Sequence, residues 1–219
     1  MPAIRLDARL SLALHMLKGA RVVADIGCDH GRLACALIQQ GAAERVIASD
    51  ISAASLDKAR ALVARCGLAE RVETRLGDGL RALRPGEAEA AALLGMGGTL
   101  MAGMLEAADA PFQGAARILF QPMRAAEDIR RWLYRNGCRI LDDRMAEAGG
   151  RLYQLILASP PSPARDELPE GWPEGFFKLG YTAFCRREPL FLTAVYRMLA
   201  RHEARLARGE APALGEGAA

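Results

Sequence analysis

The chain has 219 residues, of which 51% are apolar, and its formal net charge at pH 7 is +3. This length and composition allow one full α/β domain plus a small addition. Because it has no run of about 18 uncharged apolar residues and no basic-then-apolar leader, we expect no membrane span and a cytoplasmic location. The five cysteines form no Cys-x-x-Cys pair or zinc-like cluster, which indicates reduced thiols and no metal site.

Apolar periodicity and turn residues predict an alternation of helices and strands along most of the chain. The first expected elements are a helix over 5–17, a strand over 22–26, a helix over 31–40, a strand over 45–49 and a helix that Ser52 caps and that runs to 65. They continue with strands over 72–75 and 90–94, a helix over 99–108, a strand over 117–120 broken by Gln121-Pro122, and a helix over 125–135. A hairpin over 138–146 and 151–158 and a last helix from Glu188 to about 208 complete the series.

Alternating β–α units followed by an antiparallel pair predict an α/β fold with a mostly parallel, Rossmann-like sheet and a reversed last strand. Class I methyltransferases share this plan. We expect the domain to span residues 1–158, N-terminal helix included. Residues 159–174 contain five prolines, so we interpret 159–219 as a Pro-rich linker and a short helical C-terminal extension.

The stretch Val22–Leu33 predicts a strand, a glycine turn and the start of a helix, as at the nucleotide site of a doubly wound domain. Gly27 and Gly31 fit two small positions of the dinucleotide fingerprint, but Asp29 stands where the backbone approaches a pyrophosphate. A carboxylate there repels phosphates. The turn therefore favours a nucleoside with a cationic part and no pyrophosphate, and S-adenosylmethionine has this chemistry.

Acidic side chains follow three strands of the predicted sheet. Asp25 is placed to bind the ammonium of the ligand, Asp50 to accept both ribose hydroxyls, and Asp78 to accept from the adenine amine. Each residue alone has an ordinary alternative: a turn aspartate, a charge near the start of a helix, or an Asp-Gly turn. Together they lie at one edge of the sheet, which favours a cofactor site.

The residues after the fourth and fifth strands point to the methyl acceptor. Gly95–Gly98 leaves backbone amides open to a planar ligand, and the alternative is a simple strand-to-helix turn. Gln121 is placed to read a base edge, or is a polar residue at the rim of the core. His30 is a candidate base, although it equally fits a histidine that bonds its own turn.

Arginines near both ends of the chain are candidates for contact with RNA phosphates. Arg197, Arg201, Arg205 and Arg208 share one face of the last helix, and Arg5 and Arg9 lie one helical turn apart in the first. The alternative for the C-terminal set is a solvated helix face.

Five segments resemble the bacterial tRNA adenine-N1 methyltransferases typified by TrmK in their order and spacing. They are Asp25–His30, Ala48–Ile51, Leu76–Leu80, Gly95–Leu100 and Phe120–Pro122. The resemblance implies methylation of N1 of adenine 22 in tRNA, with S-adenosylmethionine as donor. Two departures are Met123, where the family often has asparagine, and Gly31-Arg32, where it often has Ala-Tyr.

The residue assignments that follow are of two kinds. The cofactor pocket is assigned Asp25, Gly27, Asp50, Ile51, Asp78, Gly79, Gly95 and Met96, most of them implied by the resemblance. The catalytic set is Asp29, close to the developing positive charge, with Gly97 and Gln121 on the acceptor side. Two alternatives stay open: a small-molecule methyltransferase, and a non-catalytic module that binds S-adenosylmethionine and RNA.

Overall fold

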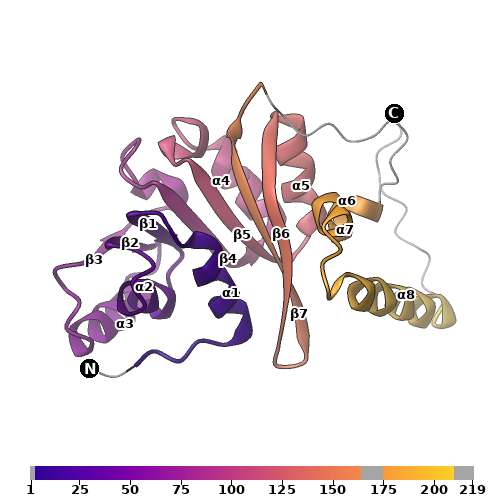
Figure 1. The fold of residues 1–219 in the computed structure, drawn as a ribbon, viewed down its shortest axis with the longest axis horizontal. Coiled ribbons are helices and arrows are strands. Elements are labelled where there is room, and N and C mark those ends of the chain that lie inside the picture. The colour runs from indigo at the N-terminus through magenta and orange to yellow at the C-terminus, as the bar shows by residue number, and fades with distance from the viewer. Residues whose placement is uncertain (1–2, 164–174, 210–219) are drawn as a thin grey trace.

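The computed structural model describes residues 3–163 and 175–209. It contains a seven-stranded sheet of order β3-β2-β1-β4-β5-β7-β6, with helices on both faces (Figure 1). The strands are β1 (Val22–Ile26), β2 (Arg45–Asp50), β3 (Val72–Leu76), β4 (Ala90–Gly97), β5 (Arg117–Arg124), β6 (Cys138–Ala148) and β7 (Arg151–Pro161). The α-helices are α1 (Ala8–Leu17), α2 (Arg32–Gln39), α3 (Ala53–Arg65), α4 (Gly98–Glu106), α5 (Ala126–Arg135), α6 (Gly175–Leu179), α7 (Tyr181–Cys185) and α8 (Phe191–Ala207). Short 3-10 turns cover Gly79–Ala82 and Pro111–Gly114.

The strand directions confirm the predicted fold class. Strands β1 to β5 pair in parallel, and β7 pairs antiparallel with both β5 and β6. The chain order reverses between β1 and β4, and an open α/β sheet leaves a crevice at such a point, outside the carboxyl ends of its strands.

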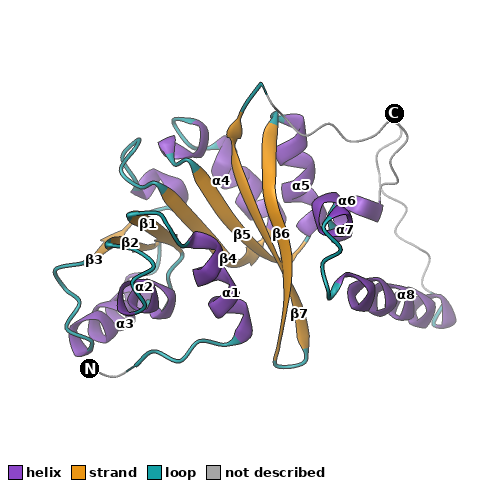
Figure 2. Cartoon of the chain, in the orientation of Figure 1, coloured by secondary structure: helices purple, strands orange, loops and turns teal. Residues whose placement is uncertain are grey.

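Both faces of the central strands are buried, which explains their continuous apolar runs. On one side Leu14, Leu33 and Leu56 pack from α1, α2 and α3. On the other side Met101 of α4 and Ile129 of α5 cover the sheet. Figure 2 shows these helices on either side of the orange strands. The two clusters hold the strand ends rigidly in place.

The first helix begins later than predicted. Asp7 is its N-cap and accepts a hydrogen bond from the backbone N–H of Leu10 at 2.8 Å, so α1 starts at Ala8 and not at residue 5. Arg5 therefore precedes the helix, and the expected helical spacing between Arg5 and Arg9 is wrong. The predicted cap of α3 is confirmed, because the Ser52 side chain accepts from the backbone N–H of Ser55.

Strands β4 and β5 run further than predicted, through the residues expected to stop them. Gly95 has a φ of +77°, and the register shifts on both sides of Met96, which pairs with Pro122. A β-bulge accommodates both the left-handed glycine and a proline without a backbone N–H, so neither residue ends its strand. The two strands continue to Gly97 and Arg124, and the added residues Gly95 and Met96 of β4 line the crevice.

The C-terminal part contains two short helices, α6 and α7, that the sequence analysis did not predict. The expected linker falls partly in β7, which runs to Pro161, and residues 164–174 and 210–219 lie outside the described residues. The last helix is observed close to its expected bounds, as α8. The division of the chain at residue 158 stays a prediction.

A buried ion pair joins α6 to the edge of the sheet. The Arg130 guanidinium donates to both oxygens of Asp143 at 3.0 and 2.9 Å, and both side chains are almost fully buried. It also donates to the Phe177 carbonyl at 2.9 Å and to Gln154 Oε1 at 2.7 Å. One arginine thus links α5, β6, β7 and α6.

Removal of one partner of this pair should be costly. We expect Asp143→Ala to lower the free energy of unfolding by about 3–5 kcal/mol, because it leaves the Arg130 charge buried without its partner. The adjacent Asp142 forms an ion pair with the exposed Arg186 at 2.9 Å. Because exposed pairs contribute little, Asp142→Ala should lower the free energy of unfolding by about 1 kcal/mol or less. Urea denaturation of both variants measures the difference, and equal losses would contradict this account of the pair.

Candidate functional site

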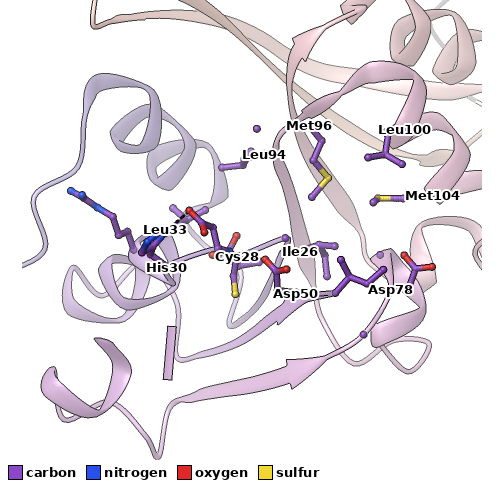
Figure 3. Close-up of a pocket in the computed structure, with 18 of the residues that line it drawn as sticks. Ile26, Cys28, His30, Leu33, Asp50, Asp78, Leu94, Met96, Leu100 and Met104 are labelled. Atoms are coloured by element: carbon purple, nitrogen blue, oxygen red, sulfur yellow. Dashed lines mark hydrogen bonds and ion pairs between the residues drawn. The ribbon is translucent and has the colours of Figure 1, made fainter. Parts of the chain in front are cut away.

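A cavity of about 500 Å³ opens at the carboxyl ends of β1, β2 and β4, where the chain order reverses (Figure 3). Its lining includes all eight residues predicted for the cofactor: Asp25, Gly27, Asp50, Ile51, Asp78, Gly79, Gly95 and Met96. Asp29, from the predicted catalytic set, lines it too. The structure therefore brings together residues that lie as much as 71 positions apart in the chain (25 to 96).

Asp25 is the most unusual group in this cavity. Its side chain is buried and its Oδ2 atom has no hydrogen-bond partner. Burial raises the pKa of Asp25 to about 7, the backbone N–H of Ala34 opposes this rise, and the negative charge of Asp50 adds to it. A buried acceptor without a partner, facing a cavity, fits a ligand that brings a cation or an N–H donor.

Asp50 is held by the backbone around it. Its two carboxylate oxygens accept from the backbone N–H groups of Asp29 at 3.0 Å and Ser52 at 2.8 Å. Each oxygen retains a lone pair, so the oriented carboxylate can still accept two hydroxyl groups from a sugar. Figure 3 shows Asp50 between Cys28 and Asp78 along one side of the cavity.

The apolar lining comes from residues that the sequence analysis mostly missed. Leu100 and Met104 lie one turn apart on α4 and face the cavity, opposite Ile26 (Figure 3). Gly27 has a φ of +72°, and a Cβ atom there would overlap the terminal methyl group of Met96. A polar edge and an apolar wall suit a ligand that is part sugar and part aromatic base. The i, i+4 spacing of Leu100 and Met104 is the sequence signal that identifies their common face.

Two members of the predicted catalytic set do not line the cavity. Gln121 is fully buried, its Oε1 accepts from Arg9 at 2.8 Å, and its Nε2 donates to the Pro122 carbonyl at 3.1 Å. Both ends of the Gln121 amide are thus occupied by partners within the protein. Gly97 is the N-cap of α4. The next glycine, Gly98, is needed for packing, since a Cβ there would overlap the Ala125 carbonyl.

Arg9 lies in the cavity rather than on an outer surface. Its guanidinium donates to Gln121, lies 5.4 Å from the centre of the Tyr153 ring, and approaches Asp7 at 3.8 Å. The first helix therefore places a cation at the end of the cavity next to β4 and β5. Its contact with Gln121 spans 112 positions of sequence, and no local pattern indicates it.

A family model described as "Methyltransferase domain" matches residues 6–156 of the chain. This range includes every residue that lines the cavity. This chain belongs to that methyltransferase family. A curated relative confirms the resemblance to the tRNA adenine-N1 methyltransferases that the motifs indicated. The curated tRNA (adenine(22)-N(1))-methyltransferase of Bacillus subtilis (strain 168) is 34% identical over 158 residues, 72% of this chain and 66% of the relative. The match thus spans slightly less than two thirds of that relative.

Solved structures of such methyltransferases share the fold over nearly the whole chain. The crystal structure of the B. subtilis m1A22 tRNA methyltransferase TrmK aligns with a TM-score of 0.82 and 28% identity, covering 97% of this chain and 91% of that one. A Streptococcus pneumoniae structure in complex with S-adenosyl-L-methionine has a TM-score of 0.82 and 24% identity, with 91% and 90% covered. At 24% identity, the similarity to the Streptococcus pneumoniae structure shows the fold alone.

The predicted RNA-binding arginines occupy different surfaces of this methyltransferase. Arg197 forms an ion pair with Glu147 at 2.6 Å, and Arg201 donates to the Arg197 carbonyl at 3.1 Å. These two line a hollow of about 540 Å³ between α8 and the end of the β6–β7 hairpin, and Arg205 and Arg208 follow further along the helix. Arg5 lies in another hollow, beside the N-terminal segment.

Within residues 3–163 and 175–209, no helix has the length and apolar character that a membrane crossing requires. In the same ranges, no group of three or more His, Cys, Asp or Glu side chains has an arrangement that would hold a metal ion. Four of the cysteines are buried, and burial raises the pKa of the Cys28 thiol beside the cavity.

The buried carboxyl of Asp25 should leave a signature in the stability of the ligand-free protein. Its pKa is raised from 3.8 to about 7, so between these values the folded state keeps a proton that the unfolded chain has released. Its contribution to the free energy of unfolding therefore falls as the pH rises through this window, by about 1.4 kcal/mol per pH unit.

Asp25→Asn removes this titration and should flatten that part of the stability profile. Urea denaturation of wild type and variant at intervals from about pH 4.5 to 7.5 measures the difference. A variant whose profile keeps the wild-type slope would show that another group carries the dependence.

Proposed function

We propose that this chain is a tRNA (adenine(22)-N1)-methyltransferase that uses S-adenosylmethionine. The observation that carries the proposal is the cavity at the reversal of strand order, where the buried Asp25 has an Oδ2 atom without a partner and so fits a cationic nucleoside. The similarity to the B. subtilis enzyme supports the choice of reaction and substrate. A tRNA substrate would fit the cytoplasmic location that the sequence favours, and we include that location in the proposal.

The cavity residues fit the donor group by group. Asp25 would bind the ammonium, which satisfies its free Oδ2 atom. Asp50 would accept the two ribose hydroxyls, and Asp78 with Gly79 would hold the adenine edge, while Ile51 and Met104 supply apolar contact. Asp29 has a φ of +48° in the first turn and fits a ligand that carries no pyrophosphate.

Methyl transfer to adenine N1 requires the protein mainly to align the base with the donor. When bound, S-adenosylmethionine supplies an electrophilic methyl group on its sulfonium. Adenine N1 carries a lone pair and needs no deprotonation, so the chain's residues must orient the base in line with the methyl group and accept a cationic product. N1 also lies on the pairing edge of adenine, so the base must enter the cavity unpaired.

We assign the acceptor side to the bulged end of β4. Gly95 is exposed there, which lets a planar base approach the backbone, and Met96 faces into the cavity. Asp29 carries a carboxylate on the same cavity and bonds the His30 ring at 2.5 Å, so His30 orients Asp29 in this proposal. Gln121 acts as a positioning residue, because it holds the Arg9 guanidinium at the cavity end.

Methyl transfer to unmodified tRNA tests the proposed function directly. We expect incubation with S-adenosylmethionine, followed by digestion and nucleoside analysis, to yield 1-methyladenosine. A transcript with guanosine in place of adenosine 22 should yield none, since it offers no acceptor at that position. Binding of tRNA and cofactor without product would identify a non-catalytic module, and transfer only to small molecules would identify the other alternative.

The ribose contact can be tested by cofactor affinity. Asp50→Ala should weaken binding of S-adenosylhomocysteine by about 1.5–3 kcal/mol, the range for a hydrogen bond to a charged group. Asp57→Ala is a matched control, because this exposed residue of α3 lies outside the cavity and, among the residues that the structure describes, pairs with Arg60 alone. Calorimetry measures both, and NADH should not bind the wild type. Tight NADH binding, or an unaffected Asp50→Ala, would argue against this assignment of the pocket.

A further inference from the structure

A second hollow of about 660 Å³ adjoins the cofactor cavity, between the N-terminal segment and helix α3. Its polar lining is Arg5, Asp29, His30, Arg32, Lys58 and Arg65. We call this hollow the basic groove. Asp29, His30 and Arg32 line both the groove and the cofactor cavity, so the two spaces meet along the turn after β1.

The wall of the basic groove is built into the fold. The backbone N–H of Ile4 donates to Gln39 Oε1 at 3.0 Å, and the Arg32 guanidinium donates to the Arg5 carbonyl. Ile4 and Leu6 also pack against the apolar core. The segment before α1 is thereby fixed across α2, and it faces the outer side of α3.

The charge in the basic groove is unbalanced. Arg5, Arg32, Lys58 and Arg65 form no ion pair among the described residues, and Asp29 is the single acid in the lining. Elsewhere in the described chain such pairing is common: Arg60, also on α3, bonds Asp57 at 2.9 Å. Four unpaired cations at one concave surface favour a polyanionic partner.

The spacing on α3 supports one continuous binding surface. Lys58 and Arg65 lie seven residues apart, two helical turns, with Leu62 between them on the same face. Both side chains are exposed, and no hydrogen bond ties either of them to the described part of the protein. Their charges are therefore available to a ligand without the loss of any contact in the fold.

We propose that the basic groove binds the phosphodiester backbone of the RNA substrate beside the nucleotide whose base enters the cavity. This inference rests on the proposed function. A base drawn out of its stack brings its own backbone to the mouth of the cavity, and the groove begins there, at Asp29, His30 and Arg32. Cationic side chains that contact phosphates fix register without reading sequence. The groove thus holds the strand while the cavity selects the base.

Lys58→Gln/Arg65→Gln tests the proposal, because both residues are exposed and outside the cofactor cavity. With S-adenosylhomocysteine present, we expect tRNA affinity at 0.1 M salt to fall about tenfold or more, and the slope of log K against log salt to shrink by about 0.7–0.9 per lost phosphate contact. In methylation assays the KM for tRNA should rise, while the rate at saturating tRNA stays near that of the wild type.

The matched control is Lys18→Gln/Arg135→Gln, which removes the same charge at the ends of α1 and α5, outside the groove. Its tRNA affinity should exceed that of the groove variant. Equal losses in both variants would show a general charge effect and overturn the proposal. So would a groove variant that loses affinity for S-adenosylhomocysteine and keeps its affinity for tRNA, which would place the carboxylate of the cofactor in the groove.

Measuring tRNA binding and methylation by the wild type beside the groove variant distinguishes failure of this inference from failure of the proposed function. Normal methylation of adenine 22 with unchanged tRNA affinity in the groove variant overturns the basic groove alone. Absence of methylation by the wild type, with tRNA binding that depends on Lys58 and Arg65, overturns the proposed function alone. A wild type that neither binds nor methylates tRNA overturns both.

Discussion

The burial of the Asp25 carboxylate at the end of β1 is the constraint on which the rest of the site depends. Its Oδ2 atom has no hydrogen-bond partner among the described residues, and the negative charge of Asp50 adds to the rise in the pKa of Asp25. A fold retains such a group at a cost in stability, and a cationic ligand removes that cost. Strand β1 is the centre of this arrangement because it pairs with both β2 and β4.

The proposed acceptor side depends on a different constraint, the irregular ends of β4 and β5. The left-handed Gly95 and the proline at position 122 meet in a bulged register, which exposes backbone where a regular ladder would hide it. Arg9 then bridges three distant parts of the chain: α1, Gln121 in β5 and Tyr153 in β7. A change at any of these positions would alter the contacts that hold the Arg9 guanidinium in the cavity.

The cations of the described residues divide into those that bond other parts of the protein and those that form no such bond. Arg130 is buried among its partners and fixes α6 to the sheet, and Arg197 joins α8 to the β6–β7 hairpin through Glu147. The number of arginines in such a chain is therefore a poor indicator of RNA binding, because arginines such as Arg130 and Arg197 bond other parts of the protein. The basic groove differs because Lys58 and Arg65 point outward beside the cavity.

By itself the sequence determined the fold class, the order of the elements through β7, and the set of residues that line the cavity at the strand ends. Strand-end acids such as Asp25, Asp50 and Asp78 are local signals, and parallel strands must bring their carboxyl ends to one edge. The helix cap at Ser52 could also be predicted from the sequence, because a cap depends on a backbone N–H only three residues away.

The tertiary structure alone decided how far β4 and β5 extend, where Gln121 points and which arginines meet. Gln121 was expected to face a base, yet its partner is Arg9, 112 residues earlier in the chain. The basic groove likewise joins Arg5, Arg32 and Lys58 from three separate segments. Side-chain direction at a bulge and contact between distant segments follow from packing, and no periodicity in the sequence encodes either of them.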